Sequence, residues 1–137
     1  MIKKEIDPVF GAIEFKYLWK KNENLLLWGK EFPISIHVAD LDEEGILPIQ
    51  REAYQKSWPH ISEFIESNKG TLLKYIQELA GVPLSKNIDD YLTPRSLLFE
   101  RDGSWGVLFD CDFDLEHGVA LIFKEESFQV SSQSDFI

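Results

Sequence analysis

The feature that most constrains the fold is a change in hydrophobic periodicity along the chain, from alternation to a helical repeat and back. Over residues 8–39, apolar side chains recur at every second position, which is typical of half-buried strands. Over residues 46–81 they recur with a period of 3.6 residues, which is typical of amphipathic helices. Alternation returns over residues 94–133. The order of strands, helices and strands predicts an α+β fold.

The first block predicts a meander of three strands. The alternating run begins near Val9 and continues to Lys20, and the polar residues 20–24 predict a turn. Residues 25–32 predict the second strand, and alternation around Ile36 predicts the third. Pro33 either breaks the second strand or confines its pairing to an edge, because proline has no N–H to donate. Short turns between successive strands favour antiparallel pairing.

The second block predicts two helices. Pro48 suits a first helical turn, where the missing N–H of proline costs nothing. Pro59 predicts the end of the first helix, because its ring clashes with the preceding turn. The apolar repeat of the second helix then continues across Asn68 and Gly70. Gly81 predicts its end, because glycine accepts the left-handed conformation that closes many helices.

The third block predicts a second antiparallel meander. Its strands are expected over residues 95–101, 105–113, 119–124 and 128–131, and its turns at residues 102–103, 116–118 and 125–126. A chain of 137 residues has the length of one ordinary domain, so a single domain is expected over residues 1–137. The predicted fold is an antiparallel sheet of about six or seven strands with two helices packed on one face.

Charge restricts the class of partner. The chain has 24 acidic and 14 basic residues and a formal net charge of −10, which argues against nucleic acid and anionic lipid. The same field attracts a basic protein. The single cysteine, Cys111, cannot form an internal disulfide, and no apolar run has the length of a signal or a membrane span. We therefore expect a cytoplasmic protein with a basic protein partner and no cofactor.

Much of the excess acid lies in two short stretches. The first contains Asp40, Asp42, Glu43 and Glu44 and lies ahead of the first helix. As a solvated loop it would interact favourably with the helix dipole, and alternatively it would bind a basic partner. The second contains Asp110, Asp112 and Asp114. Alternation would place these three carboxylates on one exposed strand face, with Phe109, Cys111, Phe113 and Leu115 on the core side.

The second stretch also allows a cation site. Asp110, Asp112 and Asp114 have the spacing that opens a calcium-binding loop, and His117 follows them. The match ends there, because Leu115 stands where such a loop has glycine and Leu121 where it has glutamate. Three interpretations remain for this stretch: a solvated strand face, a partner-binding face, and a metal-binding module or metal-dependent enzyme. No catalytic motif is identified, and burial beside carboxylates disfavours a reactive thiolate at Cys111.

The run from Asp102 to Leu121 resembles the signature of a bacterial family of small acidic domains of unknown function. The resemblance lies in Leu-Phe-Asp-Cys at residues 108–111, the acid and aromatic residue that follow, and Glu-His-Gly at residues 116–118. Residues 7–14, 28–30 and 50–54 are similar too. Pro59 and the serine-rich tail at residues 131–134 depart from the family pattern. The resemblance implies an immunity-like protein, and it carries over no catalytic residues.

Charge and resemblance together predict a non-enzymatic, cytoplasmic immunity protein that neutralises a bacterial toxin by occluding a basic surface. The first acidic stretch is the expected contact surface, and the second is the next choice. The alternatives are the metal module centred on Asp110, Asp112, Asp114 and His117, and a structural accessory domain without a discrete site.

Overall fold

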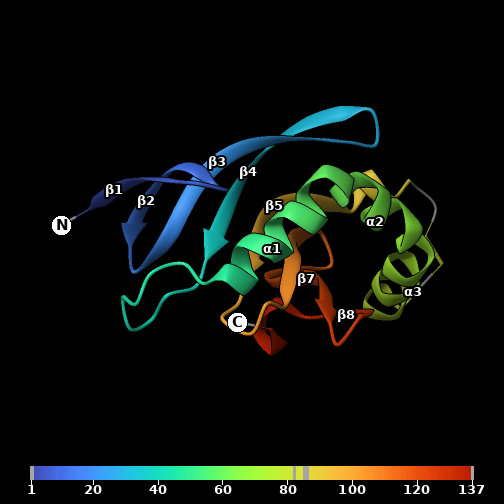
Figure 1. Cartoon of the computed structure of the whole chain (residues 1–137). Helices are drawn as coiled ribbons and strands as arrows, with labels where there is room; N and C mark the ends of the chain where they lie inside the picture. Colours follow the sequence, from blue (N-terminus) through green and yellow to red (C-terminus); the bar gives the residue numbers. More distant parts are fainter. Residues whose placement is uncertain (1, 82, 85–86, 137) are drawn as a thin grey trace.

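The computed structural model describes residues 2–81, 83–84 and 87–136, and it places eight strands in one sheet with the helices on one of its faces (Figure 1). The order of the strands in the sheet follows their order in the chain. The strands are β1 (Lys3–Asp7), β2 (Gly11–Lys16), β3 (Leu18–Leu27), β4 (Lys30–Val38), β5 (Leu92–Phe99), β6 (Trp105–Cys111), β7 (Asp114–Lys124) and β8 (Ser127–Ser131).

The predicted α+β class is confirmed, but the sheet has eight strands rather than six or seven, and it is mixed. Neighbouring strands pair antiparallel except β4 and β5, which are parallel, with Ser35 opposite Ser96 and Val38 opposite Phe99. The helical block lies between these two strands in the chain. A parallel pair needs a long crossover of this kind, and the two antiparallel meanders meet at it.

The added strand is β1, which lies ahead of the first block, and the three strands within the block have other bounds than predicted. The alternating run predicted as one strand divides at Tyr17, whose φ of +71° turns the chain between β2 and β3. Residues 20–24, predicted as a turn, instead lie inside β3. Lys20, Asn22 and Asn24 are exposed, and Lys21 and Glu23 are half-buried and paired with each other at 2.9 Å. Pro33 lies within β4, opposite Asn24. It is tolerated there because the pairing of β4 with β5 begins only at Ser35, which leaves Pro33 with one neighbouring strand.

The helical block begins at Pro48, as predicted. It comprises α1 (Pro48–Ser57), the 3₁₀ turn η1 (Trp58–His60), α2 (Ile61–Ser67) and α3 (Lys69–Ala80). The second predicted helix is divided at Asn68, whose side-chain amide donates to the carbonyl of Phe64 at 2.8 Å. Gly81 ends α3 with a φ of +72°, which confirms that prediction. Two further 3₁₀ turns are η2 (Ile88–Asp90) and η3 (Gln133–Asp135).

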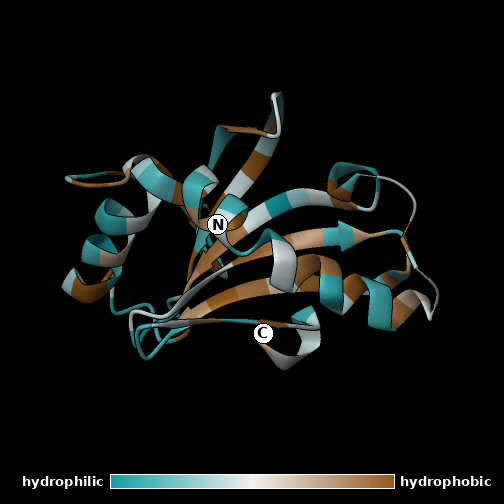
Figure 2. Ribbon diagram, turned by 90° about the vertical axis from the view of Figure 1, so that its right-hand side faces the viewer, coloured by the Kyte–Doolittle hydropathy of each residue, from teal (hydrophilic) through white to brown (hydrophobic). Residues whose placement is uncertain are grey.

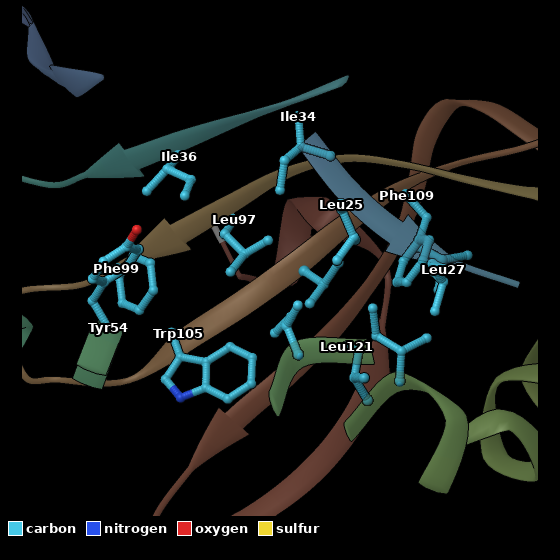
Figure 3. Packing of buried hydrophobic residues seen from close by; sticks show 14 of the residues in the cluster. Leu25, Leu27, Ile34, Ile36, Tyr54, Leu97, Phe99, Trp105, Phe109 and Leu121 are labelled. Atoms are coloured by element: carbon cyan, nitrogen blue, oxygen red, sulfur yellow. The ribbon is translucent and has the colours of Figure 1, made fainter. Parts of the chain in front are cut away.

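The core lies between the helices and one face of the sheet. Apolar residues concentrate along the strands (Figure 2), and their side chains meet from both meanders (Figure 3). Ile36, Leu97 and Phe109 of the sheet pack in one cluster with Ile65 and Ile76 of the helices, and all five are fully buried. The prediction that the helices pack on one face of the sheet is therefore confirmed.

An ion pair fastens the first hairpin to the helices. The carboxylate of Asp7 accepts from the backbone N–H groups of Val9 and Phe10, each at 2.9 Å. It also accepts from Arg51 of α1, at 3.0 Å and 2.7 Å. Although burial opposes ionisation, these bonds and the guanidinium charge hold the pKa of Asp7 below its usual value. The carboxylate therefore stays charged and links the turn before β2 to α1.

The part of the opposite sheet face that β6 and β7 form is covered by the end of the chain. Leu108, Ala120 and Ile122 form a second small cluster, and Phe136 packs on it. The ring of Phe136 lies over Gly106, where an added Cβ would approach to 2.8 Å. The segment is also held by Gln133, whose amide donates to the carbonyl of Phe109 at 2.8 Å.

Alanine substitution at two glycines should change the free energy of unfolding in opposite directions. Gly118 has a φ of +64°, and an added Cβ would lie 2.5 Å from the carbonyl oxygen of Phe109, so we expect Gly118→Ala to lower the free energy of unfolding by about 2 kcal/mol. Gly70 lies within α3 with open space around it. Gly70→Ala should therefore raise the free energy of unfolding by about 0.5–1 kcal/mol. Urea unfolding measures both, and equal effects would contradict the conformation at Gly118.

Candidate protein-docking surface

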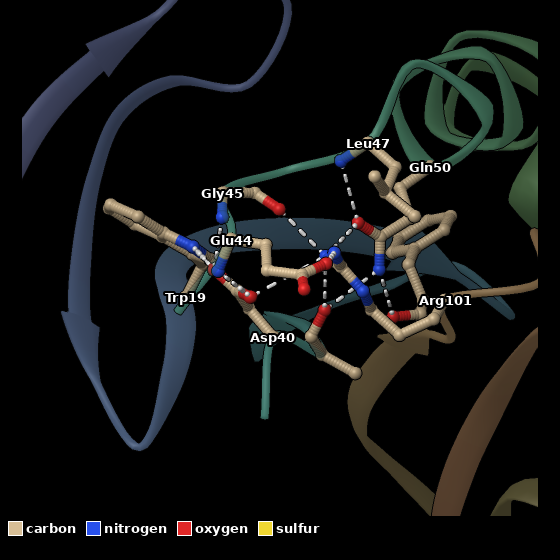
Figure 4. A network of polar contacts seen from close by, with 9 residues as sticks. Trp19, Asp40, Glu44, Gly45, Leu47, Gln50 and Arg101 are labelled. Atoms are coloured by element: carbon tan, nitrogen blue, oxygen red, sulfur yellow. Dashed lines mark hydrogen bonds and ion pairs between the residues drawn. The ribbon is translucent and has the colours of Figure 1, made fainter. Parts of the chain in front are cut away.

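The site begins with a buried carboxylate in the loop between β4 and α1. The side chain of Asp40 is 1% exposed. It accepts a hydrogen bond from the indole N–H of Trp19 at 3.0 Å and from the backbone N–H groups of Glu44 and Gly45 at 2.8 Å each (Figure 4). The guanidinium of Arg101 lies 3.6 Å away. The carboxylate thus fixes both its own loop and the start of β3.

Arg101 and Gln50 complete the network from the far side of the loop. Arg101 donates to the carbonyls of Ala39 and Gly45 at 3.2 Å and 2.7 Å, and to the side-chain oxygen of Gln50 at 3.2 Å. Gln50 is fully buried, and its amide donates to the carbonyls of Ala39 and Phe99. Side chains from α1 and from the turn after β5 therefore hold the loop at both ends.

Asp40 is charged in this setting. Burial by itself would raise the pKa of the carboxyl group. The bonds from Trp19, Gly45 and Glu44, and the charge of Arg101, outweigh that effect and hold the pKa of Asp40 below its usual value. Asp40 was expected to contact a partner, and that expectation needs correction, because a side chain buried this deeply presents nothing to a partner. Asp40 positions the loop instead.

The residues that follow Asp40 are displayed by the loop. In Figure 1 the loop projects at the lower left, ahead of α1. The side chain of Leu41 is 87% exposed, and Asp42, Glu43 and Glu44 are exposed beside it. Lys3 lies 3.4 Å from Glu43, and Arg101 lies 3.6 Å from Glu44. Surface pairs of this kind contribute little to stability, so the carboxylates remain available to a stronger cationic partner.

An exposed tyrosine lies next to this loop. Tyr17, at the turn between β2 and β3, is 82% exposed. Tyr17 and Leu41 line the same hollow of ≈ 380 Å³, together with Phe15, Lys16 and Glu43. We call Tyr17, Leu41, Asp42, Glu43 and Glu44 the loop patch. The sequence did not identify Tyr17, because its alternation matched that of a buried strand position and the left-handed turn has no local signal.

The second acidic stretch does not form the predicted strand face. β6 ends at Cys111, the chain turns at residues 112–113, and β7 begins at Asp114. Cys111 is paired with Asp114 but Phe109 with Val119, so the residues between them in β7 form an irregularity. Gly118 allows it through its positive φ. The turn predicted at residues 116–118 is therefore wrong, and those residues lie inside β7.

Because of this turn, several side chains lie in positions that differ from the predicted ones. Asp110, Asp112 and Asp114 lie in β6, the turn and β7, respectively, rather than along one strand face. Phe113 and Leu115, predicted to be in the core, are exposed, and Leu115 is 84% exposed. Cys111 is buried as predicted, and burial raises the pKa of its thiol.

The carboxylates of this second stretch are held apart by separate partners. Asp110 pairs with Arg95 at 2.5 Å, and Asp114 lies 3.3 Å from the ring Nδ1 of His117. Within residues 2–81, 83–84 and 87–136, no three His, Cys, Asp or Glu side chains gather as a metal site requires. The described residues therefore do not bring Asp110, Asp112, Asp114 and His117 together as the cation-site alternative requires.

The two acidic regions lie at opposite ends of the sheet. Val38, just before the loop patch, is paired with Phe99, which is in turn paired with Trp105. The turn after Cys111 lies at the other end of β5, where Cys111 is opposite Leu92. The two regions are therefore separated by the length of β5 and can be altered independently.

Comparison with known proteins places most of the chain in one family. A family model described as Domain of unknown function (DUF6985) matches residues 9–137. No curated protein and no solved structure matches the chain. No helix among the described residues is long and apolar enough to cross a membrane.

Proposed function

The chain belongs to this domain family of unknown function, and we propose that it is a non-enzymatic protein-binding domain. Its partner is the basic surface of another protein. In the most concrete form of the proposal, it is a cytoplasmic immunity protein of a bacterium, and it neutralises a toxin by covering the toxin's basic surface.

The observation that carries the proposal is the composition and support of the loop patch. It sets an exposed tyrosine and an exposed leucine beside three exposed carboxylates. Tyrosine is enriched among the residues that dominate binding energy at protein interfaces. The buried network around Asp40 holds the loop in one conformation, which lowers the entropy lost on binding. The patch therefore has an apolar centre, a charged rim and a rigid base.

The mechanism is occlusion assisted by electrostatic steering. A toxin that acts on nucleic acid reads phosphates with a surface rich in lysine and arginine. The acidic loop patch attracts such a surface from a distance and speeds the encounter. Tyr17 and Leu41 then supply the apolar contact that slows dissociation. No bond is made or broken, so the activity needs no catalytic residue.

The second acidic region is the weaker candidate. Asp110, Asp112 and Asp114 are spread over β6, a turn and β7, whereas the acids of the loop patch follow one another in a loop that the network around Asp40 holds. Leu115 and Phe113 add exposed apolar surface there, so this end serves as a matched control region. The metal-binding alternative requires these same acids to converge on one point, and their separate partners do not favour it.

Co-expression with a toxin domain encoded beside the gene tests the proposal. We expect the wild-type chain to restore growth of cells that produce the toxin domain. The double variant Tyr17→Ala/Leu41→Ser should bind about tenfold more weakly or worse and lose protection, because it removes the apolar centre of the loop patch. Growth on plates and affinity by calorimetry measure the two effects.

The matched control is Leu115→Ser, which removes a leucine of almost the same exposure at the other end of the sheet. It should protect as well as the wild type. If no co-encoded toxic protein is neutralised by the wild-type chain, the immunity role is wrong, and the structural accessory domain becomes the better account.

A further inference from the structure

A pocket of ≈ 320 Å³ lies between α1 and the strands β6 and β7, and none of the residues that line it belongs to the loop patch. A volume near 300 Å³ is at the lower end for small-molecule sites. Its walls are mainly apolar and include Ala53, Phe64, Trp105 and Phe123. Trp105 is stacked with Phe123, with ring centroids 5.6 Å apart, and the ring of Phe64 is 5.9 Å from that of Trp105. The walls therefore include three aromatic rings and the methyl group of Ala53 from α1.

An unsatisfied polar group lines this apolar pocket. Ser57, in the last turn of α1, is 1% exposed, and its hydroxyl has no hydrogen-bond partner. A serine in a helix commonly returns its hydroxyl to the carbonyl four residues earlier, but Ser57 does not. Buried hydroxyl groups are rarely left unpaired, because the lost hydrogen bonds to water are not replaced. A ligand with a hydrogen-bond donor would satisfy this group.

Charge around the opening favours a cation. Glu52, Asp102 and Lys56 line the pocket, so two carboxylates stand against one ammonium group. Lys56 is already paired with Glu52. Asp102 accepts from the backbone N–H and the hydroxyl of Ser104, and these bonds keep its pKa below the usual value. Asp102 is thus a charged acceptor at neutral pH. Aromatic walls also attract a cation through the electron-rich faces of their rings.

We propose that this pocket binds a small protonated amine with an aromatic body. The aromatic body lies against Trp105, Phe64 and Phe123. The ammonium group donates to the hydroxyl of Ser57 and faces the carboxylates at the opening. This site is distinct from the loop patch and does not depend on the proposed immunity role.

Three probes of similar shape and different charge test the proposal: 2-phenylethylamine, 2-phenylethanol and phenylacetate. Backbone amide shifts in NMR spectra of the full chain measure where each probe binds and how tightly. The amine should shift residues 52–57, 102–105 and 123. It should bind about threefold or more tightly than the neutral alcohol, and the anionic acid should bind most weakly.

Two variants locate the interaction. Ala53→Leu fills the pocket and should weaken amine binding by about tenfold or more, with the fold checked by circular dichroism. Ser57→Ala removes only the hydroxyl and should reduce the preference for amine over alcohol while apolar contact remains. Any of three results would overturn the proposal. The alcohol binds as tightly as the amine, the amide shifts centre on other residues, or the amine binds a folded Ala53→Leu variant as tightly as the wild type.

Discussion

Replacing Asp40 with alanine should lower the free energy of unfolding by about 3–5 kcal/mol, because the change leaves buried partners without their anion. The indole N–H of Trp19 and the backbone N–H groups of Glu44 and Gly45 all donate to this carboxylate. Trp19 is buried, so its indole N–H would be left without an acceptor. Urea unfolding followed by circular dichroism measures the loss.

The matched control is Asp42→Ala, two residues further along the same loop. Asp42 is exposed, so its removal should change the free energy of unfolding by no more than about 0.5 kcal/mol. Equal effects of the two substitutions would show that Asp40 does not anchor the loop.

The difference between wild type and Asp40→Ala should also depend on pH. The native structure lowers the pKa of Asp40, so the stabilisation from its charge is fully present above the pKa of the unfolded chain. An unfolded aspartate titrates at a pH of about 3.9. The difference in stability should therefore narrow as the pH falls below about 4.

The sequence identified those features of the fold that depend on local pattern. The order of elements, the start of α1 at Pro48 and the end of α3 at Gly81 follow from periodicity and from the backbone preferences of proline and glycine. The division of the first strand at Tyr17 has no such local basis. The parallel pairing of β4 with β5 also depends on distant segments, because it is made through the helical crossover.

The turn after β6 was missed for a different reason. Acidic and apolar residues continue to alternate through residues 109–115, so the turn does not interrupt the strand-like pattern. Only pairing with β7 determines that the chain reverses after Cys111. As a result, the exposed positions of Phe113 and Leu115 could not be predicted from alternation.

At the candidate site too, the local sequence does not determine which side chains are buried. Asp40 and Asp42 are two residues apart and look alike in sequence, yet only Asp40 is buried. Its side-chain partner Trp19 lies 21 positions away in the chain. Arg101 comes from the turn after β5 and approaches only when the sheet has formed. The sequence therefore located the acidic loop, but it could not separate the residue that supports the loop from those that the loop displays.

Reversing the charge of the loop patch should slow association with the partner by about 100-fold at low ionic strength. The variant is Asp42→Lys/Glu43→Lys/Glu44→Lys, in which three carboxylates that face the solvent become ammonium groups. An electrostatically steered encounter is accelerated by opposite charges at the contact surface, so reversal changes attraction into repulsion. Dissociation should change less, because Tyr17 and Leu41 keep their apolar contacts.

A second triple variant is Asp110→Lys/Asp112→Lys/Glu116→Lys. It distinguishes the effect of where the charges lie from the effect of the total charge. Each replacement of an acid by lysine adds two charges, so both triple variants have a formal net charge of −4 instead of −10. All six acids are exposed, so neither variant places a charge in the core. A difference in association rate between the two variants therefore reports where the partner docks.

The most direct test of the docking surface is the association rate with the toxin domain proposed as the partner, measured by stopped-flow mixing for the wild type and both triple variants at low and high salt. The loop-patch variant should associate about 100-fold more slowly than the wild type at low salt, and its rate should lose the steep decrease with added salt. The variant at the other end of the sheet should stay within about threefold of the wild type and keep that salt dependence. Equal slowing of the two variants, or an unchanged rate for the loop-patch variant, would contradict the assignment of the loop patch as the docking surface.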